Sequence, residues 1–278
     1  MSSGLLKPQL ISDLIDSKMK GGVGVALSLA LVSLSVGAAV ADWNIMAQNR
    51  KMRPDGLQIS LKNYCESWRM NVELHNIRDF EVVPEECTDY IGKYVKSTQF
   101  AVDSERTVEE CLVHLSTSCS LKNDGKDAWI FDIDDTLLST LPYYKKHNFG
   151  GEKLNLTSLE EWKRQSKAPA LAHSLQLFNE LKSRGIQIFL ISARSEKLRS
   201  ATIDNLVDVG IHGWTGLILR GDENECKDVL TFKAAARKEL LGKGYRLWGI
   251  VGDQWSSILG TPTAKRTFKL PNPLYYVA

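Results

Sequence analysis

The sequence predicts an α/β domain built on a doubly wound parallel sheet, because short apolar segments alternate with helical ones from residue 128 onward. The expected strands cover residues 128–131, 186–191, 217–219 and 247–251. Each is an almost continuous apolar run, as expected for a strand buried on both faces of a parallel sheet. Parallel strands need long crossovers, and the intervening segments supply helices for them. Ligands of such sheets bind beyond the carboxyl ends of the strands.

The expected helices have clear ends. Apolar residues recur at spacings of three and four between residues 57 and 121, which predicts an N-terminal helical extension. Later helices are expected over residues 171–184 and 196–209, ended by Gly185 and Gly210, and over residues 232–241. The domain therefore covers residues 57–278, and the polar, basic stretch before it, residues 42–56, is expected to be a linker.

Residues 21–41 contain no charged side chain and are expected to engage a membrane. Ala39-Val40-Ala41 has the small-x-small pattern of a signal peptidase site, which favours a signal peptide over residues 1–41. Roughly 20 apolar residues also span a bilayer, which would make the chain a single-pass membrane protein. Basic residues on the two sides of the segment balance, so the orientation stays open.

Composition and charge limit the kinds of partner that the protein is expected to bind. The 278 residues include 35 Lys and Arg against 33 Asp and Glu, a net charge of only +2, so no basic field points to nucleic acid. A small ligand or a protein is expected instead. The five cysteines include no CxxC pair, which argues against structural zinc.

Two features bear on the compartment. In a secretory lumen the first four cysteines could form two disulfides, leaving Cys226 odd, while reduced buried thiols are the alternative. Asn155-Leu156-Thr157 is a glycosylation sequon, which would be used only in that compartment. Both agree with a secreted protein, extracellular or vacuolar.

Polar residues gather where the expected strands end. They are Asp132 with Asp134, Ser192 with Arg194, Arg220 with Asp222, and Asp253. Three converging carboxylates, Asp132, Asp134 and Asp253, would repel one another unless a divalent cation neutralised them. Hard oxygen ligands favour Mg²⁺.

These residues resemble a known superfamily. Phe131-Asp132-Ile133-Asp134-Asp135-Thr136, then Ser192, Lys233 and Gly252-Asp253, match the motifs of haloacid dehalogenase-like enzymes in their order along the chain. Further segments resemble the plant acid phosphatases and vegetative storage proteins of the class B group, over residues 57–278. The segments that carry this resemblance are Tyr64-Cys65-Glu66-Ser67-Trp68-Arg69, Ile77-Arg78-Asp79-Phe80-Glu81-Val82-Val83-Pro84 and Val251-Gly252-Asp253-Gln254-Trp255-Ser256.

The resemblance implies a role for each matching residue. Asp132 would attack phosphorus and become an aspartyl phosphate, while Asp134 would protonate the leaving alcohol and later activate water. Mg²⁺ would be held by Asp132, the main-chain carbonyl of Asp134 and Asp253. Ser192 would donate to a phosphate oxygen. Lys233, with Lys227 as its rival, would pair nucleophile and phosphate.

Three further expectations concern the surroundings of the site. Thr136 is expected to position the loop, and Arg194 to add a two-pronged phosphate contact. The family often places a second acid where this chain has Ser257, so Mg²⁺ affinity is expected to be weaker. Residues 139–170 occupy the place of a cap that sets substrate choice.

The sequence thus predicts an acid phosphatase that hydrolyses small phosphomonoesters and leaves room for a homodimer. The alternative is a storage protein on the same scaffold with weak or no activity. The presence of Asp132 favours retained chemistry, since a purely storage descendant has no need of a nucleophile.

Overall fold

The computed structural model describes residues 51–52, 58–224 and 227–278. The chain divides into two compact units, residues 1–63 and 64–278. In the first, strand β1 (Lys51–Met52) pairs antiparallel with β2 (Gln58–Ile59). β1 falls within the stretch expected to be a linker. Everything below concerns the second unit.

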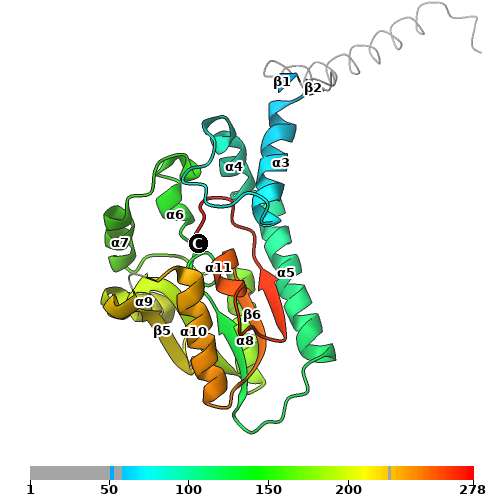
Figure 1. Ribbon diagram of the computed structural model, residues 1–278, viewed down its shortest axis with the longest axis vertical. Helices are drawn as coiled ribbons and strands as arrows, with labels where there is room; N and C mark the ends of the chain where they lie inside the picture. The colour runs from blue at the N-terminus through cyan, green and yellow to red at the C-terminus, as the bar shows by residue number, and fades with distance from the viewer. Residues whose placement is uncertain (1–50, 53–57, 225–226) are drawn as a thin grey trace, which may run out of the picture. The chain divides into compact units, whose positions relative to one another are not determined.

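The core of this unit is a five-stranded sheet with the order β5-β4-β3-β6-β7, in which every pair is parallel (Figure 1). Its strands are β3 (Asp127–Phe131), β4 (Gln187–Ser195), β5 (Gly216–Arg220), β6 (Arg246–Gly252) and β7 (Arg266–Lys269). The predicted fold class is confirmed. The edge strand β7 was not predicted, because only Phe268 of its four residues is buried and it forms no apolar run.

Helices cover both faces of the sheet. The helices of the described residues are α3 (Leu61–Glu73), α4 (Thr88–Tyr94), α5 (Thr98–Thr117), α6 (Leu141–Tyr144), α7 (Leu156–Arg164), α8 (Ala172–Ser183), α9 (Arg199–Asp208), α10 (Val229–Gly242) and α11 (Trp255–Ile258). Of these, α5, α8 and α9 cover one face of the sheet, and α10 covers the other. Alternation along β3 shows the two layers: Trp129 and Phe131 join the apolar cluster of α5, α8 and α9, while Ala128 and Ile130 join that of α10. The sheet is therefore buried on both sides, as its apolar strands require.

Local signals fix the helix ends that the sequence predicted. Gly185 and Gly210 follow α8 and α9 with φ of 72° and 86°, a left-handed conformation that glycine adopts at little cost. The side chain of Asp228 accepts a hydrogen bond from Thr231 N at 2.7 Å and so caps α10. This cap sets the start of the helix that carries Lys233.

The predicted N-terminal helical extension is present as α3, α4 and α5. A disulfide joins Cys65 of α3 to Cys87, the last residue of the 3₁₀ turn η2 (Glu85–Cys87). Cys111 and Cys119 are free thiols, so the expectation of two disulfides is wrong and one forms. Cys111 is buried on the inner face of α5, where it packs as a small apolar side chain. Cys226 lies outside the described residues.

The segment expected to form a cap folds as α6, the turn η3 (Asn148–Gly150) and α7. Figure 1 shows α6 and α7 above the carboxyl ends of the strands, beside α4. Tyr143 packs against Tyr144, His147 and Trp162, which gives the cap an aromatic core of its own.

Within the described part of the chain, no helix is both long enough and apolar enough to cross a membrane. Residues 21–41 lie outside that part, so the signal peptide and the anchor both stay predictions.

Candidate active site

The site begins where β3 ends, at Asp132. Its backbone N–H donates to Val251 O of β6 at 3.0 Å, and Ile133 N donates to its Oδ1 at 2.7 Å. The chain then turns sharply, with the N–H groups of Leu137 and Leu138 both bonded to Ile133 O at 2.9 Å. Asp135, in this turn, has a left-handed φ of 45°. The turn directs successive acidic side chains toward different partners.

Asp132 lies in a buried ion pair. Lys233 Nζ is 2.5 Å from its Oδ2, and Ser257 Oγ donates to the same oxygen at 2.7 Å. Lys233 Nζ also donates to Ser257 Oγ at 2.9 Å, which closes a triangle of the three side chains. Lys233 is buried on α10, whereas the rival Lys227 is exposed. Lys233 is thus the lysine that meets Asp132.

Asp253 follows β6 and is almost fully enclosed. Its Oδ1 accepts from Thr136 Oγ1 at 3.2 Å, while its Oδ2 accepts from Gln254 Nε2 at 2.9 Å and Asn272 Nδ2 at 2.7 Å. Burial, followed by repulsion from Asp132, raises the pKa of Asp253. The pKa of Asp135 is also raised, first by burial and then by Asp253. These carboxylates carry more negative charge than Lys233 alone balances.

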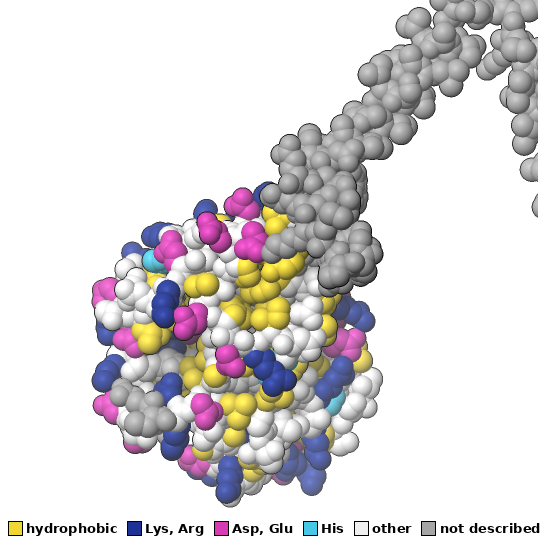
Figure 2. Space-filling view, turned by 45° about the horizontal axis from the view of Figure 1, so that its top comes forward, with side chains coloured by type: hydrophobic (Ala, Val, Ile, Leu, Met, Phe, Trp, Pro, Cys, Tyr) yellow, Lys and Arg dark blue, Asp and Glu magenta, His cyan; other side chains and the backbone are white. Residues whose placement is uncertain are grey.

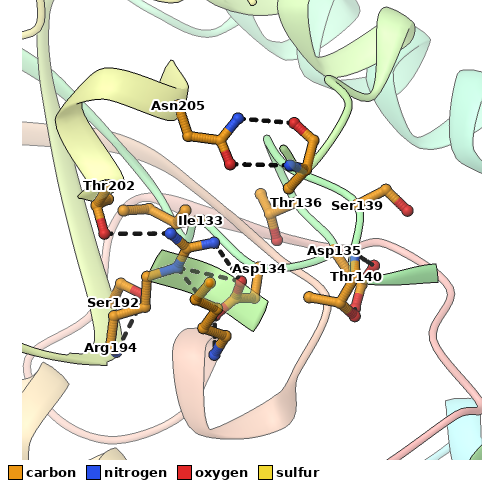
Figure 3. A network of polar contacts seen from close by, with 12 residues as sticks. Ile133, Asp134, Asp135, Thr136, Ser139, Thr140, Ser192, Arg194, Thr202 and Asn205 are labelled. Carbon is orange, nitrogen blue, oxygen red and sulfur yellow. Dashed lines mark hydrogen bonds and ion pairs between the residues drawn. The ribbon is translucent and has the colours of Figure 1, made fainter. Parts of the chain in front are cut away.

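Asp134 faces a different set of groups, drawn in Figure 3. Arg194 donates from Nη2 to its Oδ1 at 2.8 Å, and Lys163 of α7 lies 2.8 Å from its Oδ2. Burial alone would raise the pKa of Asp134, but Arg194 and Lys163 together hold it well below its usual value. The Asp134 side chain therefore forms ion pairs instead of converging with Asp132 and Asp253, which differs from the expectation.

A cavity of about 200 Å³ opens onto these residues. Five predicted residues line it: Asp132, Asp134, Ser192, Lys233 and Asp253. Thr136 and Arg194 are not among its lining residues, and they instead hold Asp253 and Asp134. Arg194 is 2% exposed and also donates to Thr202 Oγ1 at 3.1 Å. Asp222 is exposed and pairs with Lys197, outside this cavity.

Two lining groups had no sequence signal. Lys163 comes from the cap, and its basic position in the last turn of α7 looks like an ordinary helix end until the cap is docked. Tyr275, near the C-terminus, donates to Asp135 Oδ2 at 2.8 Å and stacks on Tyr144 with 5.0 Å between ring centroids. The sequence indicated Ser257 only as the place of a missing acid, whereas its hydroxyl donates a hydrogen bond to Asp132.

The residues present fit a hard divalent cation in their chemistry. Asp132 and Asp253 are buried carboxylates that line one cavity, and burial, followed by the negative charge of Asp132, raises the pKa of Asp253. A cation would relieve that repulsion. Among the described residues, no cluster of three or more acidic, histidine or cysteine side chains is placed to hold a metal. Any third protein ligand would then be a main-chain oxygen or the oxygen of an amide or hydroxyl side chain.

The fold and the arrangement of Asp132, Lys233, Ser192 and Asp253 define a hydrolase of the haloacid dehalogenase-like class. Residues 52–278 match the model of the HAD superfamily, subfamily IIIB (acid phosphatase). The chain belongs to this acid phosphatase family.

The relatives include both enzymes and storage proteins. Acid phosphatase 1 of Solanum lycopersicum is 36% identical over 90% of this chain and 97% of its own length. The stem 28 kDa glycoprotein of Glycine max is 41% identical over 77% of this chain and 84% of its own. Vegetative storage protein 1 of Arabidopsis thaliana is 39% identical over 81% and 83%.

One solved structure supports the fold alone. The class C acid phosphatase of Bacillus anthracis with tungstate bound superposes with a TM-score of 0.57 at 18% identity, over 68% of this chain and 85% of that chain.

Proposed function

We propose that this protein hydrolyses phosphomonoesters through a covalent phosphoryl group on Asp132, with Mg²⁺ as cofactor. The observation that carries the proposal is the triangle of Asp132, Lys233 and Ser257 beside the cavity. Lys233 Nζ at 2.5 Å and Ser257 Oγ at 2.7 Å hold Asp132 Oδ2 in a fixed position, as a nucleophile that attacks a bound phosphoryl group requires. Ser192 lines the same cavity and is placed to donate to a phosphoryl oxygen.

The first step transfers the phosphoryl group. An oxygen of Asp132 forms a bond to phosphorus as the ester P–O bond breaks, and Asp134 gives its proton to the departing alcohol. In the second step water attacks phosphorus, Asp134 takes a proton from that water, and the Asp132–phosphorus bond breaks. Phosphate leaves, and both carboxyl groups return to their starting states.

The low pKa of Asp134 has a consequence for this role. Arg194 and Lys163 keep the carboxyl ionised at neutral pH, so the proton-donating form is scarce there. Its population grows as the pH falls, which supports the use of this site at acid pH.

Mg²⁺ would be held by the carboxylates of Asp132 and Asp253 and the main-chain carbonyl of Asp134. When bound, it neutralises charge on the transferring phosphoryl oxygens. Thr136, Asn272 and Gln254 hold the Asp253 carboxylate in place by hydrogen bonds.

The test is hydrolysis of an aryl phosphate by the full chain, with and without Mg²⁺, compared with Asp132→Asn. The amide is nearly isosteric but a poor nucleophile, so kcat is expected to fall by several orders of magnitude with the fold intact. Equal rates for the two proteins would overturn the proposal.

A storage role with weak activity is the second candidate. Relatives named vegetative storage proteins favour it, as does Ser257 in place of the second acid that the family often has. Turnover that is slow at every Mg²⁺ concentration and pH would support the storage role.

We also propose that the protein enters the secretory pathway, by a signal peptide over residues 1–41 or by an anchor over residues 21–41. The disulfide Cys65–Cys87 and the exposed sequon at Asn155 support this. Relatives named stem glycoproteins agree. Expression in plant cells, with a mass shift on enzymatic deglycosylation that Asn155→Gln abolishes, tests it. An unglycosylated product kept in the cytosol would contradict it.

A further inference from the structure

Beyond its carboxylates and lysines, the active-site cavity has an apolar wall. Leu154, Leu156 and Leu159 of the cap line it, together with Val229 of α10 and Val277 of the C-terminal segment. Most of the exposed lining surface is apolar. Figure 2 shows hydrophobic side chains gathered between charged ones on the face of the molecule that it views.

Two of these leucines are unusually exposed. Leu154 is 40% exposed and Leu156 is 66% exposed, whereas Leu159 is buried in the cap. Exposed leucines side by side at a cavity mouth differ from scattered surface leucines, because a ligand in the cavity would remove them from water together. Their exposure is unexplained by packing within the described chain.

The cap holds these leucines in fixed positions. The side chain of Asn155, between Leu154 and Leu156, accepts from Ser158 N at 3.0 Å and caps α7. Its main-chain oxygen accepts from Tyr143 OH, a buried residue of the cap core, at 3.4 Å. The apolar wall is therefore preorganised and needs little ordering when a ligand binds.

Two basic side chains of the cavity are already committed, whereas Ser256 Oγ, buried in its lining, has no partner among the described residues. Lys163 pairs with Asp134, and Arg220 donates to the main-chain oxygen of Lys227. Hydroxyl groups of a sugar placed against the leucines would lose hydrogen bonds to water without gaining partners there. The volume of about 200 Å³ is also below the ~300–1,000 Å³ that is usual for drug-sized ligands.

We propose that Leu154, Leu156 and Leu159 form a leaving-group subsite, and that the substrate is a small phosphomonoester whose alcohol carries a compact apolar group, alkyl or aryl. The inference rests on the proposed function, since it places the phosphoryl group at Asp132. It assigns substrate choice to the cap leucines.

The test uses ethyl, propyl and butyl phosphate with the full chain, because these primary alcohols leave with similar intrinsic reactivity. Each methylene buried against the leucines is expected to raise kcat/KM by roughly fourfold, or on the order of tenfold from ethyl to butyl. Glycerol 1-phosphate, similar in length but hydroxylated, is expected to fall below butyl phosphate.

The double variant Leu154→Gln/Leu156→Gln should flatten this dependence on chain length. The matched control is Leu74→Gln/Leu241→Gln, at leucines 59% and 39% exposed that do not line the cavity, and it should keep the full dependence. A structural effect of the substitutions would change all three esters equally.

The remaining outcomes of this experiment distinguish failure of the subsite from failure of the proposed function. If ethyl phosphate is hydrolysed in an Asp132-dependent way but chain length has no effect, or the double variant keeps the dependence, the subsite is refuted and the proposed function stands. If the wild-type protein hydrolyses none of the esters, or Asp132→Asn is equally active, both are refuted.

Discussion

Ser257 offers the sharpest perturbation of the nucleophile, because its hydroxyl donates to Asp132 Oδ2 at 2.7 Å and accepts from Lys233 Nζ at 2.9 Å. A hydrogen bond to a charged group contributes about 1.5–3 kcal/mol. In Ser257→Ala the ion pair of Lys233 with Asp132, at 2.5 Å, remains, so we take the lower value. A loss of about 1.5 kcal/mol predicts a kcat reduced roughly tenfold.

The dependence of the rate on Mg²⁺ concentration shows whether Ser257 positions Asp132 or affects the binding of Mg²⁺. Ser257 bonds the side of Asp132 that faces Lys233, so Ser257→Ala should leave the half-saturating Mg²⁺ concentration within about twofold of wild type. Ser257→Asp adds a buried negative charge beside Asp132. It should lower the half-saturating Mg²⁺ concentration by roughly tenfold, the effect of a typical outer partner of a metal ligand.

The assay is initial-rate hydrolysis of an aryl phosphate against Mg²⁺ concentration, with circular dichroism to check the fold. Ser174→Ala is the matched control, since Ser174 is also fully buried and its Oγ contacts no partner among the described residues. Unchanged kcat in Ser257→Ala, or unchanged Mg²⁺ dependence in Ser257→Asp, would refute the reasoning.

Three further predictions follow from the charges and the disulfide. Lys163→Gln removes one of the two cations that lower the pKa of Asp134, so that pKa should rise and the fall of kcat/KM with rising pH should move upward in pH. A profile identical to wild type would contradict the assignment of Asp134 as proton donor. Asp135 and Asp253 have raised pKa values, so in EDTA the folded state binds more protons than the unfolded state between the ordinary carboxyl pKa of about 4 and those raised values. Urea unfolding should then show stability falling as the pH rises through those raised values, by up to ~1.4 kcal/mol per pH unit for each proton, with Mg²⁺ opposing the fall; stability that rises over this range would count against it. Replacing Cys65 and Cys87 by Ser opens a loop of sequence separation 22 and should lower the free energy of unfolding by about 3 kcal/mol, measured at neutral pH, whereas an unchanged value would mean that the bridge constrains little.

The sequence predicted the strands of the sheet that have apolar runs. The three central strands β3, β4 and β6 are apolar because both faces are covered, and Gly185 and Gly210 mark helix ends that the structure retains. The edge strand β5 was predicted because it keeps the apolar run Leu217-Ile218-Leu219, whereas the edge strand β7 has no such run and escaped prediction. β4 was expected to end at Ile191 but continues to Ser195 past a shift in register, which places Ser192 and Arg194 in the strand.

The sequence predicted which residues line the site better than it predicted which partners they contact. Motif order identified Asp132, Ser192, Lys233 and Asp253, all of which line one cavity. Spacing alone could not show that Asp134 turns away to Arg194 and Lys163, because Lys163 arrives from the cap through tertiary packing. The same holds for Tyr275, which lies 140 residues from its partner Asp135.

The most direct test of the central claim is to trap the phosphoryl group on Asp132. Full-length enzyme is mixed with an aryl phosphate and Mg²⁺, quenched in acid during turnover and reduced with borohydride, which converts an aspartyl phosphate to homoserine. Peptide mass spectrometry should find homoserine at position 132, with none in Asp132→Asn or without substrate. Steady turnover with no homoserine at position 132, or with homoserine at another aspartate, would contradict the account.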